Sequence, residues 1–476
     1  MKVIRNYLYN AGYQVLLMFA PLITTPYISR VLGAHENGIN TYTNGWVTFF
    51  YLMGQMGITL YGNREVAYHR DDKYHRSRTF WGIEALQLCT ITIALIAYLA
   101  AVFLFSTTFR TYYLIQTLWI IATGLDVSWY FMGMEDFKKT VVRNTIVKIV
   151  SIVLIFTLVK NKGDLGKYIF LLGIAQVGGN ITLWPYLKES IQWVSPKEWH
   201  PFQHFYPSLL LFIPTITTQI YLVVNKLMLG KIGQPTALGQ FDFSDKIVKL
   251  VLAIVTATGT VMLPHVANKF ASGDYKGVRE SLYKSFDFVT SMSVPMMFGL
   301  MAISAKFAPW FLGRGYEQAG GIIFFEAPVI LFIAWSNVTG TQYLMPVNRV
   351  KEFTASVSVG AVVNIVANFF LIPAYSANGA AMATVISELC VTAVQLYCVR
   401  TTIRRRMLFS GLWRYLLSGL IMYVVVLRLD QMMAMNIVNL AFQVAVGIVV
   451  YAACLVIFRA PIISQAKELL GKGAKE

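Results

Sequence analysis

Apolar segments of about 20 residues recur along the whole chain, and they restrict the possible folds more than any other feature. In bilayer hydrocarbon every backbone N–H and C=O group must find a partner within the protein, so a segment of this length crosses as a helix. Only 13% of the 476 residues are charged and 56% are hydrophobic, whereas a soluble domain has about 25% charged residues. The sequence therefore predicts an all-α polytopic membrane protein. Its fourteen expected spans lie near residues 7–29, 38–60, 79–105, 111–133, 141–160, 166–187, 205–229, 238–264, 281–304, 320–345, 354–373, 378–400, 412–430 and 436–458.

The net charge of +17 does not indicate nucleic-acid binding, because the basic residues fall in short loops between the apolar segments. Lys and Arg in such loops set membrane orientation. With the N-terminus placed in the cytoplasm, the loops on that side hold roughly three times as many basic residues as the opposite loops. The strongest markers are residues 64–78 and 400–406. This distribution predicts a multi-pass membrane protein with both termini in the cytoplasm.

The first apolar segment is expected to be a spanning helix, because no small-residue cleavage site follows a short apolar core. The four cysteines lie within apolar segments, without metal-ligand or redox spacing. A GxxxxGK[ST] pattern is absent from the sequence, so the chain is not expected to hydrolyse ATP through a P-loop. No metal or cofactor is predicted.

Two stretches of the chain share an ordered set of landmarks. Residues 21–44 begin PLITT and residues 214–245 begin PTITT; each continues to a basic residue, a glycine and a second glycine that opens the next helix. This internal repeat predicts two parallel six-helix lobes related by a pseudo-two-fold axis along the membrane normal, as in several transporter folds. The predicted divisions are residues 1–195, residues 196–403, and residues 404–476 with two extra helices and a C-terminal tail.

Four charged residues share one face of the eighth predicted span. Asp242, Asp245, Lys246 and Lys249 are spaced so that Asp242–Lys246 and Asp245–Lys249 form i, i+4 pairs, with the acid nearer the N-terminus. One interpretation is a self-neutralised stripe that faces a wet cavity. The other is that Lys249 contacts an anionic substrate and that the acids reset it between states.

Several other polar residues are expected within or beside the spans. Arg30 and Lys226 occupy equivalent places in the two repeats, while Arg143 and Lys148 lie near the start of the fifth span. Each basic residue could contact substrate, and each could equally extend its charged end to the membrane interface. The uncharged candidates could line a sugar path or join helices by hydrogen bonds; they are Asn44, Gln219 and Asn225.

Carboxylates within spans are costly unless they are paired or protonated. Asp126, Glu326 and Glu388 are therefore candidates for coupling to a proton gradient, a sodium gradient or the membrane potential. Asp242 and Asp245 are candidates for the same role.

Long segments of the chain resemble the polysaccharide repeat-unit flippases, the Wzx-like branch of the superfamily that also contains lipid II flippases and multidrug antiporters. The resemblance is carried by TPYISRVLG with GINTYTN, by WYFMGMEDFKK, by NKLMLGKIG, and by the block that begins SNVTGTQYLMPVNRV at residue 336. It covers nearly the whole chain. Asn225 departs from it, since relatives often have an acidic residue there, and any ion coupling through that position is in doubt here.

The resemblance implies a transporter, not an enzyme. Its expected substrate is an undecaprenyl-pyrophosphate-linked oligosaccharide, moved from the inner to the outer leaflet for capsule, exopolysaccharide or O-antigen assembly. The implied partners are membrane lipids and, at the outer face, a polysaccharide polymerase and a chain-length regulator. Two alternatives stay open: a multidrug or cation antiporter, for which the intramembrane lysines are unfavourable, and a membrane glycosyltransferase or polymerase, for which the external loops are short.

Overall fold

The computed structural model describes residues 2–106 and 108–465, without the side chains of residues 2–19, 137, 213–215, 217, 218, 220–222, 258–261 and 264. Within this part of the chain all regular structure is helical, which confirms the predicted fold class. The contacts divide the chain into two compact units, Met1–Gly230 and Lys231–Glu476. This division follows Gly230, whereas the sequence predicts a lobe boundary after residue 195; the lobes and the axis that relates them stay a prediction.

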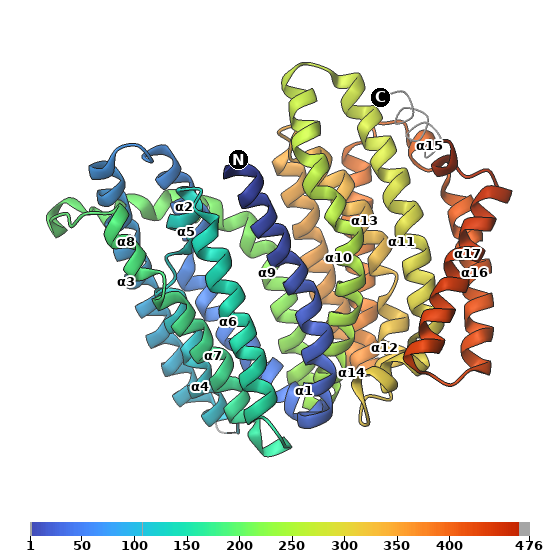
Figure 1. Cartoon of the computed structure of the whole chain (residues 1–476), viewed down its shortest axis with the longest axis horizontal. Coiled ribbons are helices and arrows are strands. Elements are labelled where there is room, and N and C mark those ends of the chain that lie inside the picture. Colours follow the sequence, from blue (N-terminus) through green and yellow to red (C-terminus); the bar gives the residue numbers. More distant parts are fainter. Residues whose placement is uncertain (1, 107, 466–476) are drawn as a thin grey trace. The chain divides into compact units, whose positions relative to one another are not determined.

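Unit 1 consists of long helices joined by short helical pieces (Figure 1). Helix α4 packs against α3 and α7, α7 packs against α6, and α1 packs against α3, α4 and α6. The elements are α1 (Lys2–Gln55), α2 (Ile58–Tyr68), α3 (Lys73–Phe105), α4 (Arg110–Gly124), α5 (Ser128–Gly133), α6 (Phe137–Leu158), η1 (Lys162–Asp164), α7 (Leu165–Ile181), α8 (Trp184–Ser190), η2 (Pro196–Glu198), η3 (Pro201–His204) and α9 (Phe205–Ile232).

The first two predicted spans join into one helical run that breaks at Gly33. The backbone of Gly33 has φ 80° and ψ 173°, a region that is open almost only to glycine. The side-chain amide of Asn37 donates to the Gly33 carbonyl at 2.7 Å and so ties the first turn of the second helix to the break. The run therefore contains two helices, as the sequence predicts.

The 38–60 span is itself interrupted at Met56 and Gly57, between α1 and α2. Two further predicted spans of unit 1 are each divided into two helices. The 111–133 segment is interrupted between α4 and α5, where Asp126 Oδ1 accepts the backbone N–H of Ser128 at 2.9 Å. The 166–187 segment is interrupted between α7 and α8, where Pro185 lies in the first turn of α8. Proline lacks the N–H group that would continue the earlier helix. The prediction of one continuous helix at each of these two places was wrong, because the length of an apolar segment does not show where a turn interrupts it.

The basic segment that the sequence interprets as an orientation marker also has a structural role. The Arg70 guanidinium donates to the Gly133 carbonyl at 2.8 Å, and Arg76 Nη2 donates to the Ser190 carbonyl at 2.6 Å. Arg78 Nε donates to the Glu198 carbonyl at 2.9 Å. These bonds tie the start of α3 and the residues before it to α5, to the end of α8 and to the connection before α9. They stabilise the polar segments at one end of unit 1.

Unit 2 is built from longer helices. Helix α11 packs against α10, α12, α13 and α16, and α16 packs against α17. The elements are α10 (Pro235–Ala271), α11 (Tyr275–Leu312), α12 (Ala319–Glu326), α13 (Val329–Ser336), the π-helix η4 (Asn337–Leu344), α14 (Val350–Cys398), α15 (Arg405–Leu408), α16 (Leu412–Met432) and α17 (Ile437–Ile457).

Helix α14 contains the eleventh and twelfth predicted spans, separated at Ser376. Ser376 has φ 52° and ψ −126°, so the chain reverses there and the two halves pack on each other. Ser387 Oγ donates to the Gly360 carbonyl at 2.7 Å across this hairpin. The tenth predicted span, 320–345, is not one helix: it consists of α12, α13 and η4, with Pro328 at the first break.

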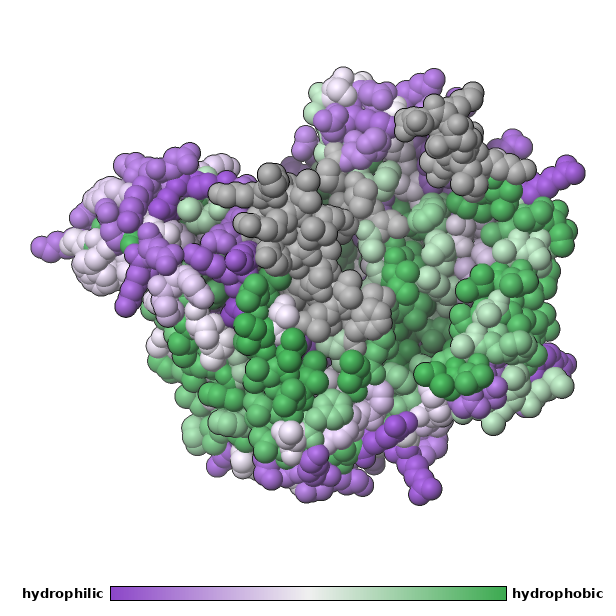
Figure 2. All heavy atoms as spheres, in the orientation of Figure 1, coloured by the Kyte–Doolittle hydropathy of each residue, from purple (hydrophilic) through white to green (hydrophobic). Residues whose placement is uncertain are grey.

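Seven helices or helical runs of the described residues are long and apolar enough to cross a membrane by length and composition. They begin at Lys73, Lys138, Tyr275, Ala319, Val350, Arg405 and Ile437. The run from Val350 holds two predicted spans across the Ser376 break. Figure 2 shows hydrophobic residues over the middle of each unit and hydrophilic residues at its ends, the surface expected of a multi-pass membrane protein.

Candidate functional site

The charged face of α10 forms two ion pairs. Lys246 Nζ lies 2.5 Å from Asp242 Oδ2, and Lys249 Nζ lies 2.7 Å from Asp245 Oδ2. Both pairs are i, i+4 with the acid first, which is the favoured order in a helix. The predicted pairing is therefore confirmed.

The two members of each pair differ in exposure. The Asp242 and Asp245 side chains are 4% and 8% exposed, whereas those of Lys246 and Lys249 are 46% and 44% exposed. Because the carboxylates are buried, each ion pair holds its lysine close to α10, while part of the lysine's surface stays accessible. The accessible part of these lysines can meet an anion without prior loss of the ion pair.

The other basic candidates are divided between three helices of unit 1. Arg30 is exposed on α1 just before the Gly33 break, and Lys226 on α9 and Lys148 on α6 are half-buried. All three already have an interaction with another group. The structure thus leaves open both predicted interpretations, substrate contact and extension to the interface.

The uncharged polar candidates have different surroundings. Asn44 Nδ2 donates to Gln116 Oε1 at 3.4 Å and so joins α1 to α4. Gln116 Nε2 in turn lies 3.3 Å from Thr43 Oγ1. These contacts favour the interhelical role of Asn44 among the two that the sequence allows. Asn225 is buried and has a partner, and Gln219 is exposed.

The acidic candidates are buried to different degrees. Asp126 is half-buried in the α4–α5 connection, not within a helix. Glu326, the last residue of α12, and Glu388 of α14 are buried, and both have interactions with other groups. Helix α12 packs against both α10 and α14, so the elements that carry the unit 2 acids are neighbours. Within the described residues, no three His, Cys, Asp or Glu side chains meet as a group that could hold a metal ion.

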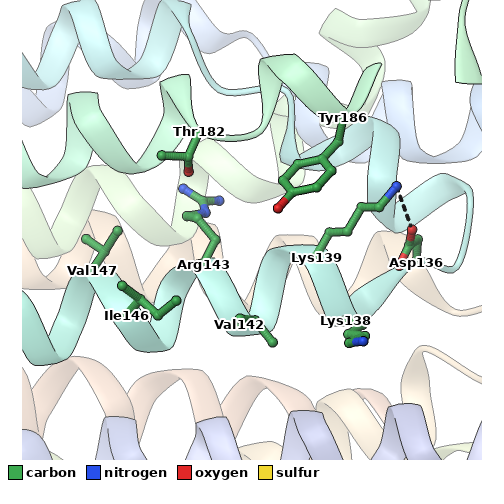
Figure 3. A pocket seen from close by; sticks show the side chains of 9 residues that line it. All are labelled: Asp136, Lys138, Lys139, Val142, Arg143, Ile146, Val147, Thr182 and Tyr186. Carbon is green, nitrogen blue, oxygen red and sulfur yellow. Dashed lines mark ion pairs between the residues drawn. The ribbon is translucent and has the colours of Figure 1, made fainter. Parts of the chain in front are cut away.

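A pocket in unit 1 gathers basic and aromatic side chains that are far apart in the sequence. Its volume is about 590 Å³, and it lies between α6, the end of α7 and α8 (Figure 3). Arg143 projects from α6 toward Thr182 and Tyr186, and the Tyr186 hydroxyl points toward it. Arg143 Nη1 also donates to Asn180 Oδ1 at 2.6 Å. The lining residues are Asp136, Lys138, Lys139, Val142, Arg143, Ile146, Val147, Thr182 and Tyr186.

Much of this pocket is not evident from the sequence. Arg143 and Lys148 are predicted candidates, but Lys148 does not line the pocket. Lys139 is not among the residues that the sequence indicates, although its ammonium group lies 3.3 Å from Asp136 Oδ2, 3.6 Å from Glu189 Oε2 and 5.1 Å from the centre of the Tyr186 ring. The close spacing of Asp136, Lys139 and Arg143 in the sequence could have indicated a charged cluster at the start of α6. The sequence does not indicate that Tyr186 of α8 lies beside this cluster.

The helical architecture and the long apolar spans define a multi-pass membrane protein. The family model described as "Polysaccharide biosynthesis protein" matches residues 3–269, more than half of the chain. The chain belongs to this family.

Individual relatives agree with this assignment. The chain is 25% identical over 409 residues to a protein of Escherichia coli (strain K12) named "Putative O-antigen transporter", with 83% of this chain and 96% of the relative covered. A protein of Shigella dysenteriae with the same name is 22% identical over 395 residues, covering 80% and 96%. A lipid II flippase of Bacillus subtilis (strain 168) is 25% identical over 145 residues, 30% of this chain and 26% of the relative.

Solved structures show the same fold at low sequence identity. A lipid II flippase, MurJ, in an inward closed conformation has a TM-score of 0.73 at 16% identity and covers 96% of this chain and 98% of its own. An inward-facing multidrug resistance transporter of the MATE family and MOP superfamily has a TM-score of 0.64 at 10% identity, covering 80% and 94%. The relatives named as transporters agree with the prediction that the chain is a transporter and not an enzyme.

Proposed function

We propose that this protein is a flippase that moves an undecaprenyl-pyrophosphate-linked oligosaccharide repeat unit across the bacterial cytoplasmic membrane. The unit would move from the inner to the outer leaflet and there enter capsule, exopolysaccharide or O-antigen assembly. The relatives named as O-antigen transporters and as lipid II flippases support this substrate class, because each of those names denotes the movement of a glycan or glycolipid.

The observation that carries the proposal is the pair of accessible lysines on α10. A pyrophosphate in hydrocarbon is costly unless cations compensate its charge. Lys246 and Lys249 supply two cations on a helix that the sequence predicts to span the membrane, and their buried acids keep this face of the helix neutral when no substrate is bound. A cation antiporter has the opposite requirement, a site whose accessible charge is negative.

The mechanism proposed is alternating access, in which a cationic central cavity opens first to the cytoplasm and then to the outside. The excess of basic residues in alternate loops supports cytoplasmic N- and C-termini. The substrate would contact Lys246 and Lys249 through its pyrophosphate, with Lys226, Arg30, Gln219 and Asn225 as further contacts. An outer-face polymerase and a chain-length regulator are the proposed partners that receive the delivered unit.

A reconstituted assay tests the proposal directly. The purified protein is placed in proteoliposomes with a lipid-linked oligosaccharide that carries a fluorescent sugar, and the accessible fraction is measured with a membrane-impermeant quencher. We expect protein-dependent exchange between leaflets that the Lys246→Ala/Lys249→Ala variant lacks. Equal exchange in protein-free liposomes and in proteoliposomes would refute the flippase assignment.

Ion coupling is proposed to involve Glu326, a buried acid at the end of α12, the helix that packs against α10. The further candidates for this role are Asp126, Asp242, Asp245 and Glu388. In the same proteoliposomes, an imposed proton or sodium gradient should accelerate transport by the native protein. The Glu326→Gln variant removes the ionisable group while it keeps the size, so the acceleration should shrink. Unchanged gradient dependence would exclude Glu326 from this role.

A further inference from the structure

The pocket between α6, α7 and α8 has no part in the substrate path proposed above, yet it is built to hold an anion. The Arg143 guanidinium is fixed by the 2.6 Å bond from Nη1 to Asn180 Oδ1. The Tyr186 hydroxyl faces it from α8 (Figure 3) and, among the described residues, has no hydrogen bond of its own. Arg143 and Tyr186 thus present hydrogen-bond donors to the same space. Such a pair suits the oxygen atoms of a phosphate.

The other wall of the pocket is apolar and continues beyond it. Val142 and Ile146 line the pocket and are 39% and 56% exposed. The same face of α6 continues through Val150 and Val153, which are also exposed. Of the seven candidate spans, the one in α6 is the least buried within the protein. A water-soluble anion gains nothing from such a wall, whereas an acyl chain can lie along it.

The charge count distinguishes between anionic lipids. Lys138, Lys139 and Arg143 supply three cations, but Lys139 already pairs with the carboxylates of Asp136 and Glu189. Three cations and these two carboxylates, Glu189 lying beside the lining residues, leave one net positive charge. Lys138 is exposed and makes no ion pair with any described residue. A single surplus charge matches the phosphodiester of a phospholipid, while a pyrophosphate diester, with two negative charges, is undercompensated.

We propose that this pocket binds the headgroup of an anionic phospholipid, with the phosphodiester between Arg143 and Tyr186 and one acyl chain along the exposed face of α6. Basic pockets between transmembrane helices on the cytoplasmic side are suited to such headgroups. The volume of about 590 Å³ falls in the range of small-ligand sites, about 300–1,000 Å³. The bound lipid would bridge α6 and α8 at the end of the membrane where α6 begins.

Native mass spectrometry of the full-length protein in detergent tests this site. The protein is titrated separately with phosphatidylglycerol and with phosphatidylethanolamine, and retained lipids are counted. We expect one tightly retained phosphatidylglycerol.

The Arg143→Gln variant keeps a hydrogen-bond partner for Asn180 but lacks the charge, and should bind phosphatidylglycerol about tenfold more weakly, as expected for one lost charge-assisted bond. Lys160→Gln is the matched control: this exposed cation follows the far end of the same helix and should bind as the native protein does.

Two milder variants keep the test informative if Arg143→Gln does not fold. Lys138→Gln changes an exposed residue, and Tyr186→Phe removes one hydroxyl while it keeps the ring; each should weaken retention of phosphatidylglycerol. Equal retention of the two phospholipids, or no effect of any pocket variant, would overturn the proposal. So would displacement of phosphatidylglycerol from the pocket by equimolar isoprenyl pyrophosphate, which would assign the pocket to substrate. Because no transport is measured, these results are independent of the proposed function.

Discussion

At the scale of single residues, Lys249 is the side chain on which the proposed transport depends most. Its ammonium group lies 2.7 Å from the Asp245 carboxylate, yet almost half of its side chain is exposed. A lysine needed only to neutralise Asp245 could be removed together with that acid. A lysine that meets substrate could not.

We therefore expect Lys249→Ala to abolish polymer export while the protein still inserts in the membrane. The double variant Asp245→Asn/Lys249→Gln, which leaves no unpaired charge, should not restore export. Immunoblots of membrane fractions give the control, because a buried carboxylate without its partner costs about 3–5 kcal/mol and can lower protein level. Native export by Lys249→Ala, or recovery in the double variant, would show that the pair is only a neutral stripe.

His204 provides a prediction on pH. Its Nδ1 lies 2.8 Å from the Tyr61 hydroxyl, and burial, with a smaller effect of Arg78, lowers its pKa from 6.5 to about 4. Between these values the unfolded chain binds a proton that the folded protein does not, so stability falls as pH decreases from 6.5 toward 4. The loss reaches at most about 2 kcal/mol at pH 5.

Thermal unfolding of the purified protein at pH 7.5 and pH 5 measures this effect. His204→Asn keeps a polar atom near the Tyr61 hydroxyl but does not titrate. The melting temperature of the variant should therefore fall less between the two pH values than that of the native protein. The same decrease in both proteins would show that His204 does not contribute.

The residue scale also shows what the sequence could predict of the site. The α10 pairs were predictable because i, i+4 spacing on one helix places the charges together whatever the tertiary structure. The pocket at Arg143 was not, because Tyr186 reaches it only through the break between α7 and α8. For Asn44, the sequence allowed either a sugar contact or an interhelical hydrogen bond. The bond to Gln116 depends on the packing of α1 against α4, which the sequence does not show.

At the scale of elements, breaks in long helical runs determine how the chain reverses. Gly33, at φ 80° and ψ 173°, has open space around its Cα: the nearest atom to an added Cβ is Lys162 Cε at 3.7 Å. Any penalty for Gly33→Ala must therefore come from backbone conformation and not from a clash. We expect a loss of about 1–3 kcal/mol, measured as a lower melting temperature.

Gly178→Ala is the matched control for that substitution. Gly178 lies within α7, and nothing is within 4 Å of an added Cβ. Alanine there should be neutral or stabilise the protein by up to about 1 kcal/mol. Equal effects of the two substitutions would mean that the break at Gly33 does not need glycine.

The positions of most spans could be predicted because membrane-crossing helices need long apolar runs, and each of the fourteen segments is largely helical. The internal breaks could not. The run from 320 to 345 is as apolar as its neighbours, yet it bends at Pro328 and continues as a π-helix from Asn337. Hydropathy predicts whether a segment lies in the membrane, but it does not predict where the helix within that segment is interrupted.

At the scale of the whole molecule, the chain shares its fold with a lipid II flippase and a multidrug transporter. The three candidate functions, flippase, antiporter and polymerase, predict different locations of a lipid-linked sugar in cells that lack this protein. A missing flippase leaves the unit at the cytoplasmic leaflet. A missing antiporter does not affect its sidedness, and a missing polymerase leaves single units outside. The distribution of the unit across the membrane therefore separates the flippase from both alternatives.

The most direct measurement is the sidedness of lipid-linked oligosaccharide in cells depleted of this protein, assessed by the access of a membrane-impermeant sugar-specific probe in intact and in opened cells. We predict accumulation at the cytoplasmic leaflet, with loss of the surface polymer and recovery of both by the native protein but not by Lys249→Ala. Normal sidedness with new drug sensitivity, or accumulation of unpolymerised units at the outer leaflet, would contradict the proposed function.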